Sequence, residues 1–283
     1  MKRNYERGMP MENIRELVRA RRSVRSFDSR ELSAEDREKL TAFMEKIENP
    51  YDIPVRFRLL SARKSGLTSP VITGADCYVG ARVGRLPGAE EAFGYSFEML
   101  VLYAQSLGIG TTWIGGTMDR AAFERAMELR EEEMMPCVSP LGYPAAKMSL
   151  REIAMRKGVR ADHRAAFGQV FFDGDWQTPL TEEKAGHLRD ALEAVRWAPS
   201  AVNKQPWRLV ATEKAVHFYE QHSKGYVSPA TGDLQKVDMG IALCHFALAA
   251  RESGLRFHFE RTDPGLPTPD GTEYIASYCF DEP

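Results

Sequence analysis

The stretch FEMLVLYAQSLG, residues 97–108, decides how this chain is expected to fold. Its apolar side chains would lie on nearly every side of a helix, a pattern typical of a helix buried in the middle of a protein. The helix is predicted to end at Gly108, and a glycine-rich extended run, IGTTWIGG (109–116), follows it. We therefore expect a domain built around this helix.

A similar stretch, LCHFALAARESG (243–254), occurs late in the chain. Two further pairs of segments resemble each other in the same order: 40–50 with 188–199, and 53–59 with 205–211. The offsets are about 146 to 152 residues. We interpret the pattern as two related α+β halves, residues 1–170 and 171–283, each a mainly antiparallel sheet packed with helices. The alternative is that short helix–turn–strand segments resemble one another by chance.

Hydrophobic periodicity and capping signals predict the other elements. Residues 146–168 are basic and polar and are expected to cross the surface. Helices are predicted over 12–20, from Ser33, after Asp119, from Thr181 and over 236–255, and strands over 54–62, 77–84, 137–144, 207–212, 256–260 and 273–280.

Composition narrows the class of protein. The 43% hydrophobic content is enough for a substantial core, and a net charge of −2 gives no general attraction to nucleic acid or to an anionic membrane. No apolar stretch approaches the roughly 20 residues of a membrane helix, and the N-terminus lacks the apolar core of a secretory signal. The four cysteines form no CxxC pair, so no metal site or disulfide framework is expected, and the setting is predicted to be cytoplasmic.

The turn RRSVR offers the arginines Arg21, Arg22 and Arg25, with the Ser23 hydroxyl between them. The guanidinium group presents its donors in a rigid fork that suits phosphate, and a tight turn can direct several forks at one anion. The alternative is that these arginines form a solvated basic face.

The run GIGTTWIGG has neither GxGxxG spacing nor a P-loop lysine, which excludes Rossmann and Walker sites. Gly115 and Gly116 could let backbone N–H groups approach a ligand closely. The alternative is a helix C-cap followed by a tight strand.

The stretch WAPSAVNKQPWR (197–208) is more specific. Pro199, Ser200 and Ala201 permit close approach of the backbone, while Asn203 and Gln205 present donors and acceptors that suit the polar edge of a heteroaromatic ring. No GxSxG elbow surrounds the serine, which argues against a serine hydrolase. The alternative is a polar turn between a helix and a strand.

Together, RRSVRSF, WAPSAVNKQPW, LGIGTTWIGG and LGYP resemble the signatures of the FMN-dependent nitroreductase family. Members of that family are intertwined homodimers. Each FMN lies at the interface, between the RRSxR turn and glycine run of one subunit and the PSxxN loop of the other. Here the turn and glycine run occur only in the first half, and the loop only in the second; NPYDIPVRF (49–57) stands in the first half's loop position. The resemblance implies a nitroreductase-like fold in a fused, diverged pseudo-dimer, monomeric, with one FMN site.

The resemblance also implies roles for individual residues. Arg21, Ser23 and Arg25 would hold the phosphate and the flavin edge, with Arg22 in the same turn. A basic residue after the Gly-Tyr-Pro strand would complete the phosphate site; Arg164 is the candidate, with Lys147 and Arg160 as alternatives. The remaining cofactor-binding candidates are Gly115 and Gly116 near the flavin N5, and Pro199, Ser200, Ala201, Asn203 and Gln205 along the ring.

The implied activity is a ping-pong oxidoreductase reaction in which NADH or NADPH reduces FMN. A small electron-poor acceptor, such as a nitroaromatic, a quinone or a flavin, is then reduced. The cofactor carries the chemistry, so no catalytic side chain is expected. His245, within an apolar helix, is the one histidine worth closer study. The alternatives are a flavin-binding protein without turnover, a structural or regulatory protein, and a dehalogenase or flavin destructase.

Overall fold

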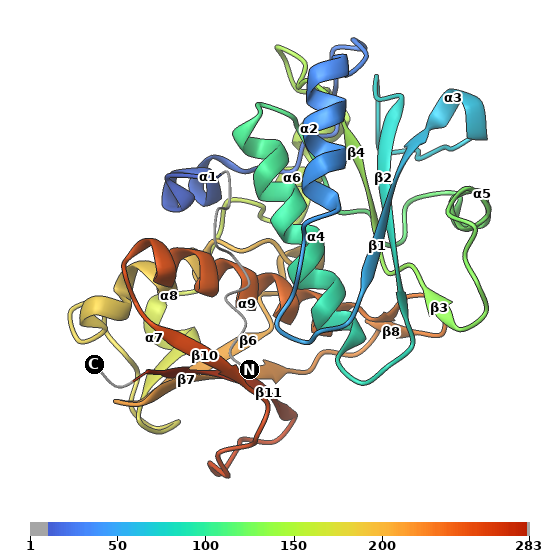
Figure 1. The fold of residues 1–283 in the computed structure, drawn as a ribbon. Coiled ribbons are helices and arrows are strands. Elements are labelled where there is room, and N and C mark those ends of the chain that lie inside the picture. Colours follow the sequence, from blue (N-terminus) through green and yellow to red (C-terminus); the bar gives the residue numbers. More distant parts are fainter. Residues whose placement is uncertain (1–10, 282–283) are drawn as a thin grey trace.

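The computed structural model describes residues 11–281. Two central helices, α4 (Ala89–Ser106) and α9 (Leu234–Glu252), cross in the middle of the molecule, with one sheet beside α4 and a second beneath α9 (Figure 1). Both helices are buried along most of their length, which confirms the prediction from their apolar sequences.

The first sheet is antiparallel. Strand β2 (Cys77–Gly84) pairs with β1 (Val55–Ser61) along one edge and with β3 (Glu133–Met134) and β4 (Val138–Leu141) along the other. Isolated bridges from Ile114 to Val138 and from Gly110 to Gly142 continue it into the glycine run. The helices of this half are α2 (Ala34–Met44), capped by Ser33 as predicted, α3 (Ala62–Ser65), and α5 (Arg120–Ala126), capped by Asp119.

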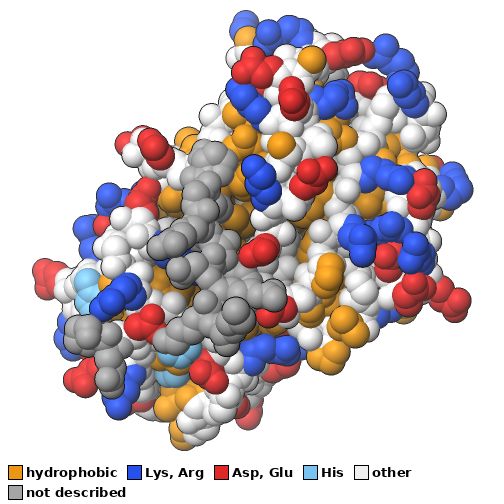
Figure 2. Space-filling view, viewed as in Figure 1, with side chains coloured by type: hydrophobic (Ala, Val, Ile, Leu, Met, Phe, Trp, Pro, Cys, Tyr) orange, Lys and Arg blue, Asp and Glu red, His pale blue; other side chains and the backbone are white. Residues whose placement is uncertain are grey.

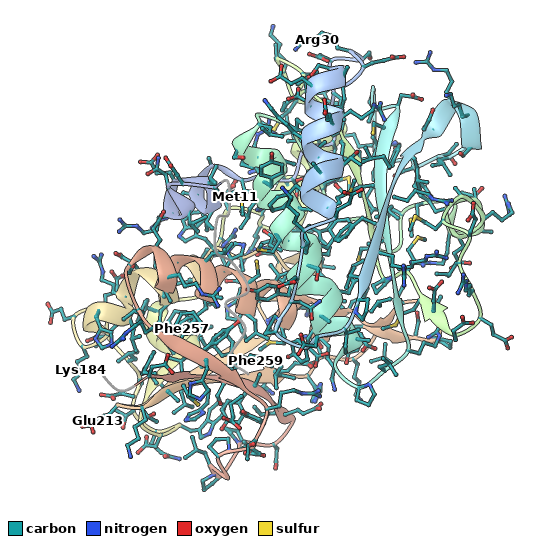
Figure 3. The ribbon with its side chains drawn as sticks, in the orientation of Figure 1. Met11, Arg30, Lys184, Glu213, Phe257 and Phe259 are labelled. Atoms are coloured by element: carbon teal, nitrogen blue, oxygen red, sulfur yellow. The ribbon has the colours of Figure 1, made fainter. Side chains whose placement is uncertain are left out.

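The second sheet has the order β10 (Phe257–Glu260), β11 (Thr272–Phe280), β7 (Ala215–Gln221), β6 (Trp207–Ala211) and β5 (Phe171–Asp173). Only the β5–β6 pairing is parallel. Phe257 and Phe259 lie on β10 (Figure 3). The centroid of the Phe257 ring lies 4.9 Å from that of Tyr278, and the centroid of the Phe259 ring lies 5.8 Å from it. The other elements are α7 (Phe167–Val170), the 3-10 turns η1 (Gly186–Leu188) and η2 (Ala201–Asn203), helix α8 (Arg189–Arg196), and the hairpin β8 (Val227–Ser228) and β9 (Gly232–Asp233).

The two halves share one arrangement. The neighbours β1–β2–β4 of the first sheet correspond to β6–β7–β11 of the second, and in each half the long central helix follows the middle strand. The predicted repeat is therefore present in the topology.

The contact between α4 and α9 is reciprocal. A Cβ atom on Gly94 would lie 2.0 Å from the carbonyl oxygen of Val237, and one on Gly240 would lie 2.1 Å from that of Glu91. Each glycine thus faces the residue three positions before the other glycine. This pattern is the signature of a two-fold contact between equivalent surfaces, and it lets the two backbones approach closely at the crossing.

Three sequence-based expectations need correction or addition. The predicted helix start at Thr181 is wrong, because the segment from Thr181 forms turns and η1 before α8 begins at Arg189. Within 146–168 the structure contains a helix, α6 (Leu150–Gly158), with Leu150 and Ile153 exposed. Strand β7 was not predicted, although it pairs with both β6 and β11.

Acidic and basic side chains are interspersed on the face seen in Figure 2, with hydrophobic side chains between them. Among the described helices, none combines the length and the apolar character needed to cross a membrane.

Candidate functional site

The basic turn 21–25 follows α1 (Ile14–Ala20), and Arg21 donates its N–H to the carbonyl of Leu17 at 2.8 Å. Val24 donates its N–H to the carbonyl of Thr111 at 2.8 Å, and Ser23 forms a bridge with the same residue. The RRSVR turn and the glycine run therefore lie side by side, as the resemblance implied.

The Arg21 side chain is buried, and within the described structure neither its Nε nor its Nη1 has a hydrogen-bond partner. Burial lowers the pKa of Arg21; the charge of Glu98 opposes this shift and that of Arg156 adds to it. Buried guanidinium donors without partners are costly for a fold to keep. Such donors indicate a place where an anionic group would be favourable.

Arg164 lies near Arg21. Burial, followed by the positive charge of Arg21, lowers the pKa of Arg164 to about 10, and the Arg164 Nε is another buried donor without a partner in the described structure. Its guanidinium stacks 4.9 Å from the centroid of the Trp197 ring. The alternatives Lys147 and Arg160 are exposed, which favours Arg164 as the basic residue of the site.

Helix α6 supplies charges that sequence analysis missed. Glu152 is buried, accepts the backbone N–H of Arg25 at 3.2 Å and forms an ion pair with Arg22 at 3.1 Å. Arg22 is thus directed at Glu152. Burial lowers the pKa of Arg25, with Glu152 opposing and the nearby Arg156 adding to the shift. Arg156 repels Arg21, Arg25 and Arg164, and Arg21 also repels Arg164. We call these four residues the arginine cluster.

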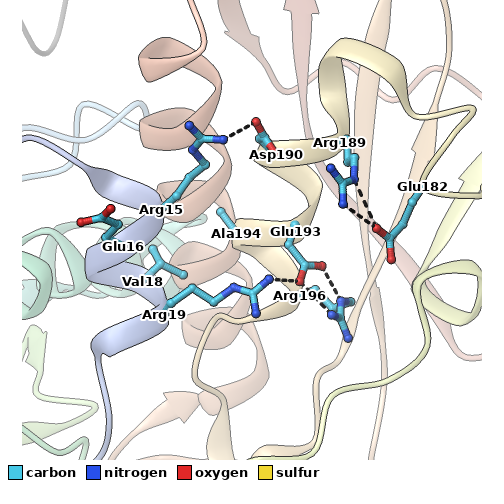
Figure 4. A pocket seen from close by; sticks show the side chains of 10 residues that line it. All are labelled: Arg15, Glu16, Val18, Arg19, Glu182, Arg189, Asp190, Glu193, Ala194 and Arg196. Atoms are coloured by element: carbon cyan, nitrogen blue, oxygen red, sulfur yellow. Dashed lines mark hydrogen bonds and ion pairs between the residues drawn. The ribbon is translucent and has the colours of Figure 1, made fainter.

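Ion pairs fasten α1 of the first half to α8 of the second (Figure 4). Arg19 pairs with Glu193 at 2.6 Å and stacks 4.4 Å from the centroid of the Trp197 ring, on which Arg164 also stacks. Arg196 pairs with the same Glu193, also at 2.6 Å. The turn that follows α1 is therefore held close to the loop that follows α8.

The loop at 199–206 has an unusual backbone. Val202 adopts a positive φ of 50° although it is β-branched, and Asn203 and Gln205 also have positive φ. Such conformations are strained for L-residues and cluster at functional sites. Asp238 of α9 holds the loop, because both of its carboxylate oxygens lie 3.0 Å from the N–H of Ala201.

Hydrogen bonds within and from the loop hold the segment that carries Arg164. The Asn203 amide donates to the carbonyls of Arg160 and His163 at 2.8 and 3.1 Å. The Gln205 side chain accepts the N–H of Ala165 at 2.9 Å. Ser200 Oγ accepts the N–H of Gln205 at 2.9 Å, while the half-buried Pro199 begins the loop.

Gly115 lies against the start of α9, where a Cβ atom on the glycine would lie 3.4 Å from the Leu234 side chain. The carbonyl of Gly115 accepts from Arg120 at 2.6 Å, and a Cβ atom there would lie 3.4 Å from the sulfur of Cys137. Burial raises the pKa of the Cys137 thiol, and the negative charge of Asp238 adds to the shift. Gly116 is exposed, with open space where its Cβ would be.

A buried polar network lies between the central helices. Glu98 Oε2 accepts from the indole of Trp113 at 3.1 Å, and Glu98 Oε1 lies 2.9 Å from His245 Nε2. His245 Nδ1 lies 2.9 Å from the carbonyl of Ala194. A carbonyl only accepts, so Nδ1 must carry hydrogen, and a proton lies between Nε2 and Glu98.

Comparisons with known proteins bear on the family and the fold of the chain. A family model described as "Putative TM nitroreductase" matches residues 13–250. The chain belongs to this nitroreductase family. A solved "putative nitroreductase" from Thermotoga maritima covers 99% of this chain and 98% of its own, at 18% identity and a TM-score of 0.62. The nitroreductase-like fold is thereby confirmed, and the repeated strand order of the two sheets shows its two halves.

Shorter structures align with part of the chain. A nitroreductase family protein from Clostridium difficile 630 is 15% identical and covers 52% of this chain and 92% of its own, with a TM-score of 0.42. An FMN-dependent nitroreductase from Clostridium difficile R20291 is 13% identical and covers 47% and 88%, with a TM-score of 0.40. No match was found among curated proteins.

We predict that Glu98→Ala lowers the free energy of unfolding by about 3–5 kcal/mol, because it leaves His245 Nε2 and the Trp113 indole buried without their partner. Urea denaturation measures the change. The control is Glu38→Ala, which removes an exposed carboxylate of α2 and should change stability by less than about 0.5 kcal/mol. Equal effects of the two substitutions would show that the network contributes nothing to stability.

Proposed function

We propose that this nitroreductase family member is an FMN-dependent oxidoreductase with one FMN site between its halves. The observation that carries the proposal is the arginine cluster, in which buried Arg21 and Arg164 donors have no partner in the described structure. A phosphate monoester supplies the negative charge and acceptor oxygens that these donors lack. The cluster lies where the RRSVR turn approaches the loop of the other half, at the junction the resemblance implies.

The proposed site uses residues of both halves, divided as 1–170 and 171–283. Arg21, Ser23, Arg25 and Arg164 would hold the phosphate, and Gly115 and Gly116 would bring backbone N–H groups toward the ring. Arg22 and Gln205 would support the site through Glu152 and the 160–165 segment. Pro199, Ser200, Ala201 and Asn203 would line the ring from the second half, on a loop that Asp238 fixes.

FMN, when bound, would supply the hydride-transfer chemistry. The side chains of this chain would then bind and orient: the arginine cluster fixes the phosphate, and the strained loop fixes the edge of the ring. We propose a ping-pong reaction in which NADH or NADPH is the donor and a small electron-poor molecule, such as a nitroaromatic, quinone or flavin, is the acceptor.

We further propose a monomeric, cytoplasmic protein. The contact between α4 and α9 already joins the two halves within one chain. All four cysteines are free thiols, which fits a reducing compartment.

We predict about one FMN per chain in the purified protein. The measurement is flavin extraction and quantitation, followed by anaerobic reduction with NADH and NADPH in parallel. Two FMN per chain would contradict the single site. Bound FMN that neither donor reduces would instead indicate a flavin-binding protein without turnover, and no flavin at all, even after reconstitution, would refute the cofactor.

A further inference from the structure

Glu220, near the end of β7, has a fully buried side chain. Among the described residues, the only group within reach of its carboxylate that could donate a hydrogen bond is the ring of His222, which contacts Oε1. The site proposed above makes no use of this carboxylate, so it needs a separate explanation.

Two further ligand groups face Glu220. His222 Nδ1 lies 2.8 Å from Glu220 Oε1, and an oxygen of Asp233 completes a group whose ligand atoms lie within 4.8 Å of one another. The fold fixes all three positions. Glu220 is paired with Trp207 and Glu273 in the sheet. The backbone N–H of His222 donates to the carbonyl of Gly271 at 2.8 Å, and Asp233 is the N-cap of α9.

The second nitrogen of His222 is also occupied. Nε2 lies 3.2 Å from Glu273 Oε2, and Glu273 Oε1 pairs with Lys236 at 2.9 Å. A histidine that binds a metal through one nitrogen commonly donates its other N–H to a carboxylate, which fixes the tautomer and the ring orientation. Glu273 is placed to do this, leaving Nδ1 directed at Glu220.

We propose that Glu220, His222 and Asp233 form a binding site for one divalent transition-metal ion, with Zn²⁺ as the representative. One imidazole nitrogen and two carboxylates are ligands that Zn²⁺ accepts, and three protein ligands leave a position for water. Among the described lysines and arginines, only Lys236 forms an ion pair with one of the carboxylates of Glu220, Asp233 and Glu273, so the group carries excess negative charge. His222 is 41% exposed, which gives an ion access.

The ion would fasten the β8–β9 hairpin between β7 and α9. In the first half, β2 leads to α4 without such a hairpin. The hairpin touches the other half, because Asp233 donates its N–H to Glu90 of α4 at 3.4 Å and Gly232 lies against the same side chain. The proposed role is therefore structural, and it does not depend on the flavin site.

A second group of potential ligands, His258, Glu260 and Cys279, serves as a control. These residues are all partly exposed, and His258 is already paired with Asp281 at 3.0 Å. This group contains no buried carboxylate.

The test uses the full-length protein, treated with EDTA and then freed of it, in calorimetric titrations with ZnCl2 and MgCl2. We expect one Zn²⁺ per chain, no measurable Mg²⁺ binding and a Zn²⁺-dependent rise in Tm. His222→Gln and Glu220→Gln, which change side-chain volume little, should each weaken Zn²⁺ binding at least about tenfold and remove the rise in Tm. His258→Gln should bind as the unmodified protein does.

Three outcomes would overturn the proposal. The first is no Zn²⁺ binding by the unmodified protein. The second is undiminished binding by the folded His222→Gln and Glu220→Gln variants. The third is loss of binding in His258→Gln alone, which would place the ion at the other cluster. The FMN content of each variant is measured in parallel and should not change. The outcome of the Zn²⁺ titration can therefore be separated from the outcome for the proposed flavin site.

Discussion

Replacing Arg21 by methionine is expected to remove most of the affinity for FMN while leaving the chain folded. Methionine keeps much of the side-chain length but lacks the donors. The buried Nε and Nη1 of Arg21 have no hydrogen-bond partner within the described structure, so their removal leaves no acceptor unpaired. Loss of charge-assisted hydrogen bonds to a phosphate costs about 1.5–3 kcal/mol, or roughly a 10- to 150-fold rise in Kd. Fluorescence titration of the flavin-free protein measures the Kd, and urea denaturation measures the stability.

The same change at Arg164 should act in the same direction, and the double variant Arg21→Met/Arg164→Met should retain no FMN through purification. Arg63→Met is the matched control, because the Arg63 side chain is 75% exposed and lies outside the cluster. FMN affinity that is undiminished in Arg21→Met would show that the phosphate site has been misplaced. Weaker binding of both FMN and riboflavin would show a general loss of the site, since riboflavin has no phosphate.

Gly240→Ala and Gly94→Ala should each destabilise the protein by about 3 kcal/mol or more. The added Cβ would lie 2.1 or 2.0 Å from a backbone carbonyl oxygen of the facing helix. Because backbone cannot move aside as a flexible side chain can, the two helices must separate, and the core around them loses its packing. Chemical denaturation with matched tryptophan fluorescence and circular dichroism measures the loss.

Gly158→Ala provides a control with the opposite sign. Gly158 ends α6, and no atom lies within 4 Å of where its Cβ would be. Alanine there should leave the stability unchanged or raise it by up to about 1 kcal/mol, because alanine favours a helix more than glycine does. The double variant Gly94→Ala/Gly240→Ala should lose less than the two single losses added together, since the first substitution already moves the helices apart. Stabilisation by Gly240→Ala would refute the close contact.

Helix caps and hydrophobic patterns, which depend on neighbouring residues, predicted individual helices correctly. The caps at Ser33 and Asp119 each depend on residues within one helical turn, so the sequence alone was sufficient to place α2 and α5. The all-round apolar pattern likewise placed α4 and α9. Helix α6 lacks such a pattern, because Leu150 and Ile153 are exposed while the acidic Glu152 is buried. Its hydrophobic periodicity therefore did not reveal it.

The candidate site was predicted in part. The RRSVR motif pointed to Arg21 and Arg25, and the resemblance implied Arg164 with Lys147 and Arg160 as alternatives. Nothing in the sequence marked Glu152 or Arg156, which reach the turn only because α6 packs over it. The amides of Asn203 and Gln205 were expected to face a ring, and the structure shows them holding the 160–165 segment. Such contacts join segments about 40 residues apart and depend on the tertiary fold.

The proposed ion site illustrates the same limit. Sequence analysis considered cysteine spacing and gave no reason to expect a metal. Asp233 reaches Glu220 and His222 only after the β8–β9 hairpin returns the chain to the start of α9. Strand pairing brings the ligands together, and their spacing in the sequence matches no known metal-binding motif.

The crossing of α4 and α9 has a consequence for how the two halves can change. In a homodimer every substitution occurs twice, once in each copy, and dilution can separate the copies. Here Gly94 and Gly240 belong to one chain, so the halves meet at a local concentration set by the segment that connects them, whatever the concentration of the protein. Each half can also acquire substitutions that the other lacks. One half can therefore carry a sequence that the other lacks, such as PSAVNKQPW in the second half where the first has NPYDIPVRF, while the shared crossing stays intact.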